Sequence, residues 1–150
     1  WYSWGSVLGD NKYIIFNSDD AESNSTFNST VTATTFMAGI ASSGQPTVAF
    51  LFATLAGVSK VGSVVHSGTT NVDCGFSGGA RFVMVKRTDS AGDWYYWDTM
   101  RGIAAGNDPY LRFNQGAGEV TNTDYIDPLA SGFTLTSSFT AGTYIYLAFA

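Results

Sequence analysis

Short strand-like runs separated by turn residues dominate this sequence and constrain its fold more than any other feature. No window shows the i, i+3, i+4, i+7 apolar spacing of an amphipathic helix. Clusters of Gly, Asn, Asp and Ser separate runs that have the length and the β-branched or aromatic content of strands. These runs lie at 12–16, 47–55, 60–66, 81–87, 94–97, 110–113, 132–136 and 143–149. The pattern predicts an all-β chain, an antiparallel β-sandwich or jelly-roll-like module.

Two of these runs allow more detailed predictions. In 81–87 the residues alternate, which places Phe82 and Met84 on one face and Val83 and Val85 on the other. The following turn at 90–93 would connect this strand to the next one as a hairpin. The run 47–55 is almost continuously apolar, so it is predicted to be a strand buried on both faces.

The sequence also resembles itself. Tyr13 to Asn17 (YIIFN) matches Tyr110 to Asn114 (YLRFN), and Trp1 to Trp4 (WYSW) matches Trp94 to Trp97 (WYYW). Residues 1–53 therefore resemble residues 94–150. We predict that residues 1–57 are a degenerate half-repeat of the closing part of a module, followed by the complete module at 58–150. The alternative is that both parts pack as one unit. Because the first residues resemble the inside of a repeat, we expect the chain to be part of a longer polypeptide.

Composition excludes several classes of function. Net charge is −5 and the seven basic residues are scattered, whereas a nucleic-acid surface needs a basic stripe to neutralise phosphates. The single cysteine, Cys74, excludes an intrachain disulfide and any cysteine-based zinc cluster, and we expect it to be a small buried residue. No run reaches the roughly 18 apolar residues of a membrane helix, so no membrane insertion is expected.

The inventory of catalytic residues is small. His66 is the only histidine, and no Gly-x-Ser-x-Gly motif accompanies it, so we expect a surface or turn histidine rather than a general base. Neither the acids at 19–22 nor those at 124–127 have the spacing of a calcium loop, which favours solvated loop acids. These observations predict a protein that is not an enzyme and that needs no cofactor or metal.

An aromatic run flanked by carboxylates provides the one candidate binding site. Aromatic faces next to carboxylates can bind sugars, and the candidate ligand-binding residues are Asp93, Trp94, Tyr95, Tyr96, Trp97 and Asp98. Because strand residues alternate, only two of the four rings can share one surface. A hairpin with core aromatic residues explains the same pattern and is the favoured interpretation. A third hypothesis is a polysaccharide-degrading enzyme that uses two of Asp89, Asp93 and Asp98, about 5–10 Å apart in one groove.

Two N-glycosylation acceptor motifs begin at Asn24 and Asn28. They predict a surface loop, and whether they carry glycans depends on passage through a glycosylating secretory system.

An ordered set of segments resembles a known family. The segments are Lys60 to Ser63 (KVGS), 78–87 (GGARFVMVKR), 90–102 (SAGDWYYWDTMRG), 132–135 (GFTL) and 141–150 (AGTYIYLAFA). In this order they resemble a β-sandwich module of tail-fibre and other virion structural proteins of tailed bacteriophages. The similarity covers about residues 60–150. The sequence departs from the family pattern at 69–79. Modules of the family often carry a Gly-rich turn and a proline there, whereas this chain has Cys74 to Gly79 (CGFSGG).

The resemblance implies a function as well as a fold. It implies a non-enzymatic virion structural module of a fibre, tail or capsid-decoration protein, located in the virion or outside the cell. Its partners would be other virion proteins and copies of itself, with a trimer implied by the symmetry common among phage fibres. The family carries no established catalytic residues, so none is transferred. The alternative function is a carbohydrate-binding adhesin that recognises a host-surface glycan.

Overall fold

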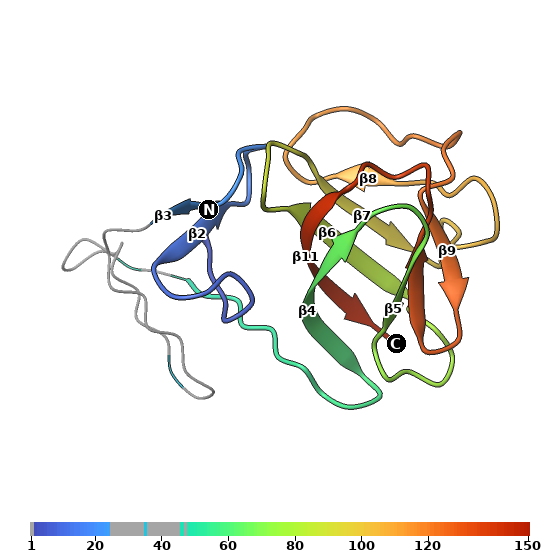
Figure 1. Ribbon diagram of the computed structural model, residues 1–150, viewed down its shortest axis with the longest axis horizontal. Helices are drawn as coiled ribbons and strands as arrows, with labels where there is room; N and C mark the ends of the chain where they lie inside the picture. Colours follow the sequence, from blue (N-terminus) through green and yellow to red (C-terminus); the bar gives the residue numbers. More distant parts are fainter. Residues whose placement is uncertain (1, 25–34, 36–45, 47) are drawn as a thin grey trace.

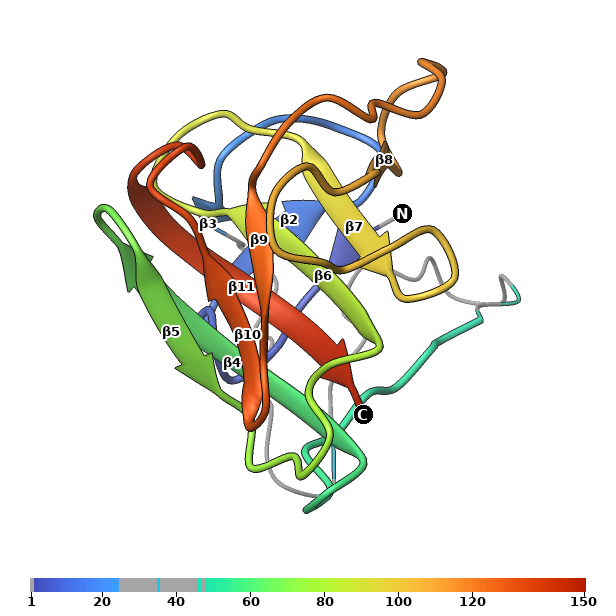
Figure 2. The ribbon, with the colours of Figure 1, turned by 90° about the vertical axis from the view of Figure 1, so that its right-hand side faces the viewer.

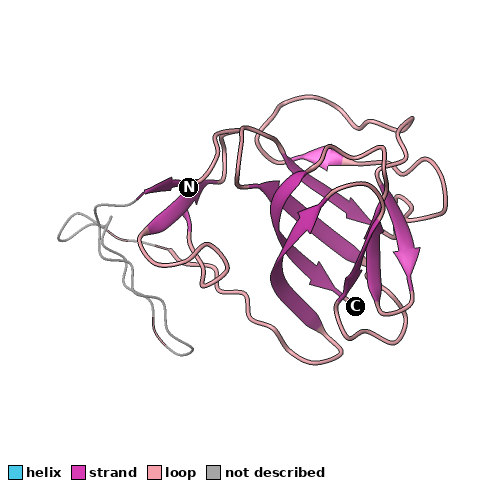
Figure 3. Cartoon of the chain, in the orientation of Figure 1, coloured by secondary structure: helices cyan, strands magenta, loops and turns pink. Residues whose placement is uncertain are grey.

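The computed structural model describes residues 2–24, 35, 46 and 48–150, and its regular structure consists of strands alone (Figures 1 and 3). All strand pairs are antiparallel, which confirms the all-β prediction. The strands in this part of the chain are β1 (Tyr2–Ser3), β2 (Lys12–Ile15), β3 (Ser23–Asn24), β4 (Ser59–His66), β5 (Thr70–Asp73), β6 (Phe82–Arg87), β7 (Trp94–Asp98), β8 (Leu111–Arg112), β9 (Ile126–Leu129), β10 (Gly132–Leu135) and β11 (Gly142–Phe149).

Two sheets pack face to face into a β-sandwich (Figure 2). One has five strands in the order β4-β11-β6-β7-β8, and the other has three in the order β5-β10-β9. Val83, Val85 and Trp97 of the large sheet share one buried core with Phe133 and Leu135 of β10. Because strand residues alternate between faces, each strand contributes every second side chain to this core.

β11 lies in the middle of the large sheet. It pairs with β4 from Gly142↔His66 to Phe149↔Ser59, and with β6 on its other edge. Gly62 of β4 lies opposite Tyr146, and a Cβ atom at this glycine would approach the Tyr146 hydroxyl to 2.5 Å. The absence of a side chain at position 62 therefore allows the tyrosine ring to lie over β4.

The predicted hairpin between 81–87 and 94–97 is confirmed as β6 and β7. Val83 and Val85 are fully buried in the sandwich core, whereas Phe82 and Met84 occupy the opposite face, as the alternation predicts. We call this opposite face of the large sheet the outer face, because it points away from β5-β10-β9.

Residues 2–24, here called the N-terminal unit, cover part of the outer face (Figure 1). β1, β2 and β3 form its small sheet. Leu8 and Ile14 of the unit pack with Trp94 and Ile145 in a second buried cluster. Main-chain hydrogen bonds strengthen this contact, including one of 3.1 Å from the Glu22 N–H to the Thr88 carbonyl. The outer face is therefore apolar because part of it is an internal interface.

The prediction of a buried strand at 47–55 is wrong for the residues that the structure describes. Residues 48–54 belong to no strand, and Phe50 and Leu51 are 70% and 72% exposed. Position 47 lies outside the described residues. An apolar run becomes a buried strand only where neighbouring strands are available to pair with it. In the large sheet the position between β4 and β6 is occupied by β11, and this segment only touches the other edge of β4, where Thr54 accepts a hydrogen bond from the Val61 N–H and Leu55 forms a single bridge with Ser59.

The aligned residues of the sequence repeat pair in the same register. Tyr2↔Ile15 and Ser3↔Ile14 join β1 to β2, while Tyr95↔Arg112 and Tyr96↔Leu111 join β7 to β8. In the sequence alignment, Tyr2 and Ser3 of β1 correspond to Tyr95 and Tyr96 of β7, and the residues they face in β2 correspond to those faced in β8. Parts of the half-repeat, including Thr26 and Phe36, lie outside the described residues, and the division at residue 57 stays a prediction.

Candidate functional site

The candidate aromatic strand is β7, which divides its four rings between two faces. Tyr95 and Trp97 stack at a centroid distance of 5.9 Å inside the sandwich, whereas Trp94 and Tyr96 lie on the outer face. Trp94 and Trp97 are 2% and 0% exposed. Neither tryptophan can therefore present its ring to a ligand, and a four-ring platform is not formed. Tyr95 and Tyr96 are half-buried.

The flanking carboxylates are held by different partners. Asp93 accepts hydrogen bonds from Arg112, Asn114 and Gln115 at 2.7–3.1 Å. At the other end of β7, Asp98 forms an ion pair with Arg101 and accepts hydrogen bonds from the backbone N–H groups of residues 100 and 101. Both carboxylates therefore have structural roles. Asp93 holds residues 112–115 against the start of β7, and Asp98 holds the turn that follows β7.

Asp89 belongs to a third arrangement, in the turn between β6 and β7. Its Oδ1 accepts a hydrogen bond of 2.6 Å from Arg87 Nε, and its Oδ2 accepts one of 3.1 Å from the Thr143 N–H. The hydrogen bond from Arg87 lowers the pKa of Asp89 below its ordinary value. The turn is thereby attached to the start of β11, and the guanidinium is held in one orientation.

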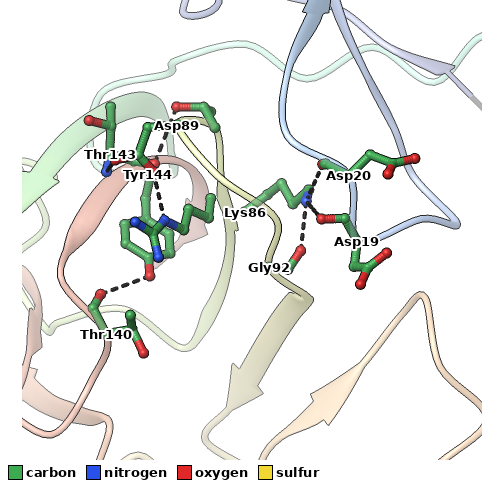
Figure 4. A network of polar contacts seen from close by, with 10 residues as sticks. Asp19, Asp20, Lys86, Asp89, Gly92, Thr140, Thr143 and Tyr144 are labelled. Atoms are coloured by element: carbon green, nitrogen blue, oxygen red, sulfur yellow. Dashed lines mark hydrogen bonds and ion pairs between the residues drawn. The ribbon is translucent and has the colours of Figure 1, made fainter.

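A cavity of about 150 Å³ lies beside this turn. Its lining comes from three chain segments: Arg87, Ala91, Gly92 and Tyr95 of the β6–β7 hairpin, Tyr125 before β9, and Phe139, Thr140 and Tyr144 around the start of β11. Tyr144 of β11 donates a hydrogen bond of 2.8 Å to the Thr140 carbonyl, which connects β11 to the loop that precedes it (Figure 4). Of the residues predicted to bind a ligand, only Tyr95 lines this cavity. The other lining residues escaped the sequence analysis because they come together only in the folded chain.

Lys86 is a second group that the sequence analysis missed. Its side chain is fully buried, and its Nζ donates to the carbonyl oxygens of Asp19, Asp20 and Gly92 at 3.0, 2.7 and 2.6 Å (Figure 4). Burial lowers the pKa of this amine to about 8. Two of the three carbonyls belong to the N-terminal unit. Lys86 therefore acts as a structural anchor between the unit and the sandwich.

Beyond the N-terminal unit, the outer face carries a row of aromatic side chains. Neighbouring rings in this aromatic row have centroids 4.1–6.3 Å apart, and its members are Phe52, Phe149, Phe82, Tyr96 and Phe113. The guanidinium of Arg101 lies 5.1 Å from the centre of the Tyr96 ring. Phe52 and Phe113, at the two ends, are 58% and 41% exposed. The row is thus an apolar surface that is only partly covered.

His66 is buried, contrary to the prediction of a surface or turn position. Its Nδ1 lies 3.0 Å from Thr70 Oγ1, and its Nε2 lies 3.2 Å from the Phe139 carbonyl. A carbonyl can only accept a hydrogen bond, so Nε2 carries the proton. Both ring nitrogens therefore form hydrogen bonds within the folded chain. Cys74 is buried as predicted, directly after β5, and burial raises the pKa of its thiol to about 11. Such a thiol is unsuited to nucleophilic chemistry.

The remaining predicted sites lie on the surface or outside the described residues. Asn24 is exposed at the end of β3, and Asn28 lies outside the described residues. Within residues 2–24, 35, 46 and 48–150, no three His, Cys, Asp or Glu side chains are grouped so as to hold a metal ion. In the same part of the chain no helix is long and apolar enough to cross a bilayer.

Comparisons with known proteins complete this description. No curated protein and no solved structure matches the chain. One family model matches it over residues 1–150, its entire length. The chain therefore belongs to the family described as Domain of unknown function (DUF7483).

Proposed function

We propose that this chain is a non-enzymatic β-sandwich module of a virion structural protein in a fibre, tail or capsid decoration. It acts by assembling with copies of itself and with other virion proteins. The observation that carries the proposal is the exposed apolar segment 48–55. Val48, Phe50, Leu51 and Leu55 are each 59–72% exposed there, and soluble monomers rarely leave such a continuous apolar stretch uncovered.

The sequence repeat supports a pairing role for this segment. Residues 48–53 align with 145–150, which form most of β11 and its C-terminal end. β11 has a strand on each edge, whereas the segment 48–54 belongs to no sheet. The same residue pattern is thus compatible with a central strand, and strands from a second copy could pair with this segment by β-strand addition.

The aromatic row extends the apolar surface next to this segment. Phe52, at its exposed end, contacts Phe149 of the large sheet at a centroid distance of 6.3 Å. The segment and the row therefore form one continuous surface. A partner that covered both would bury several aromatic side chains, the residue type that most often dominates interface energetics.

Sedimentation velocity over a range of concentrations tests the assembly. We expect the wild-type chain to form a defined oligomer, with a trimer implied by the phage-fibre resemblance. The double variant F50S/L51D should weaken association at least tenfold, because it places a polar and a charged group on the surface that would be buried. M100S is the matched control, since Met100 is 91% exposed in a turn elsewhere.

The two outcomes are distinguishable. Equal association of F50S/L51D and wild type, or a wild-type monomer at every concentration, would overturn the proposal of assembly through this segment. The virion assignment rests on the sequence resemblance and has its own test. Mass spectrometry of purified phage particles should detect peptides of this chain in stoichiometric amounts, and their absence would contradict the location.

A further inference from the structure

The cavity beside the β6–β7 turn has the features of a small binding site, a role that goes beyond assembly. It lies where loops gather at one end of the sandwich, the place where this fold class commonly carries binding residues. Its volume of about 150 Å³ is below the roughly 300–1,000 Å³ of sites for drug-sized molecules. A ligand of this cavity is therefore a single ring or a comparably small group.

The walls of the cavity combine aromatic rings with free hydrogen-bond donors. Tyr95 and Tyr125 are half-buried and line the cavity, and neither hydroxyl bonds to another residue that the structure describes. Arg87 uses its Nε for Asp89, which leaves both Nη groups without a hydrogen bond to the described residues. The Tyr95 ring stacks on Trp97 and the Tyr125 ring on Tyr110, so the site offers mainly N–H and O–H groups, which suit the hydroxyls of a small ligand.

The polar groups are held in place before any ligand arrives. Asp89 fixes the Arg87 guanidinium from one side, and Gly142 allows it to lie against β11. A Cβ atom at Gly142 would approach Arg87 Nε to 2.7 Å, so a larger residue there would displace the side chain. Because little ordering remains to be done on binding, a small ligand would lose less free energy to immobilising these groups.

The charge balance selects a neutral ligand. Among the described residues that line the cavity, Arg87 alone is basic, and Asp89 compensates its charge. The chain carries a net charge of −5. Phosphate or a strongly acidic group would meet one neutralised cation in a negative surrounding field. A neutral molecule with several hydroxyls fits this chemistry better.

We propose that this cavity binds one neutral pyranose unit of a glycan. The hydroxyl groups of Tyr95 and Tyr125 and the Arg87 Nη groups form hydrogen bonds with the hydroxyls of the sugar. This site replaces the four-ring platform expected from the sequence and uses only Tyr95 from it. It would serve the alternative role of a host-recognition adhesin, whether or not the chain also assembles through segment 48–55.

Saturation-transfer difference NMR on the intact chain tests the site. The probes are glucose, galactose, mannose, N-acetylglucosamine and N-acetylgalactosamine, each as the free monosaccharide. We expect transfer to at least one of them and a dissociation constant in the millimolar range. Ala91→Trp should abolish it, because Ala91 is an exposed lining residue and an indole there fills the cavity without touching the core.

Ala117→Trp is the matched control, since Ala117 is exposed in a loop that does not line the cavity. It should bind like wild type. Tyr125→Phe keeps the ring and removes one donor, so affinity should fall about fivefold. Circular dichroism verifies that each variant is folded. The proposal is overturned if no probe binds wild type, if Ala91→Trp binds equally well, or if both tryptophan variants lose binding together.

Discussion

Two buried charged side chains illustrate how this chain stabilises charge at the scale of single residues. Lys86 and Asp108 are both fully buried, but their surroundings differ. Three carbonyl oxygens surround the amine of Lys86. Asp108 Oδ1 accepts a hydrogen bond of 2.7 Å from the Ala104 N–H, and the Ile126 N–H also favours the ionised carboxylate, while Oδ2 meets no partner at full hydrogen-bond geometry among the described residues. The first charge is well compensated and the second is not.

Replacing Lys86 by Met should destabilise the chain by about 3 kcal/mol, because three carbonyls would lose the charged donor that a fully buried amine supplies, while the apolar stem is retained. Urea denaturation measures the loss. Lys12→Met is the control, since it removes a partly exposed ion pair with Glu22 and should cost less than about 1 kcal/mol. Equal effects of the two substitutions would contradict the anchoring role of Lys86.

Asp108 should make stability depend on pH. Burial raises its pKa to about 6, and the charges of Asp127 and Asp124 add to the effect. The folded chain then holds the proton more tightly than the unfolded chain, whose pKa is about 3.9. The stabilising contribution is fully present below about pH 3.9 and is lost as pH rises through 6.

Asp108→Asn removes this dependence. At pH 7.5 the variant should be more stable than wild type by about 1–3 kcal/mol, and the difference should disappear near pH 4. Thermal unfolding at several pH values measures it. The exposed Asp10→Asn, which makes the same charge change, should show no such trend. A variant less stable than wild type at pH 7.5 would show that the ionised carboxylate is needed.

At the scale of elements, β11 holds the large sheet together because it pairs with β4 on one edge and with β6 on the other. Its pairing with β4 places Tyr146 over Gly62, and the same ring packs edge-on against Phe133 at 5.6 Å. The contact thus joins the two sheets of the sandwich. A side chain at position 62 would have to displace the ring from both partners.

Gly62→Ala should therefore destabilise the sandwich by about 1–3 kcal/mol through overpacking. Gly116→Ala is the control, because a Cβ atom there meets nothing within 4 Å. Chemical denaturation of both variants measures the difference. If Gly62→Ala were as stable as Gly116→Ala, the Tyr146 ring would have an alternative position of equal energy, and the close approach would have no structural importance.

At the scale of the whole molecule, the N-terminal unit and the sandwich share a buried cluster. Ile14 packs with Trp94 and Ile145, and Trp94 Nε1 donates a hydrogen bond of 3.1 Å to the Ile15 carbonyl. With the Lys86 anchor, these contacts make part of the outer face of the large sheet an internal interface. We therefore favour one intimately packed unit over two independent parts.

One cooperative transition should follow from this shared cluster. Tryptophan fluorescence and far-UV circular dichroism should report the same unfolding midpoint. Ile14→Ala should lower the free energy of unfolding by about 2–5 kcal/mol, because it leaves a cavity against Trp94. Both signals should report the same loss. Two separate transitions, with only the first affected by Ile14→Ala, would show that the N-terminal unit unfolds by itself.

The sequence by itself determined the all-β class, the β6–β7 hairpin and the opposite faces of Phe82 and Val83, since alternation and turn residues are local signals. Only the tertiary structure decided which apolar runs are buried. Val48 to Ala53 is as apolar as β11, but burial requires neighbouring strands, and no local pattern reports whether they exist. The same holds for Lys86 and for the cavity at Tyr95. Their partners come from distant segments of the chain, so these sites arise only when the sheets and loops pack together.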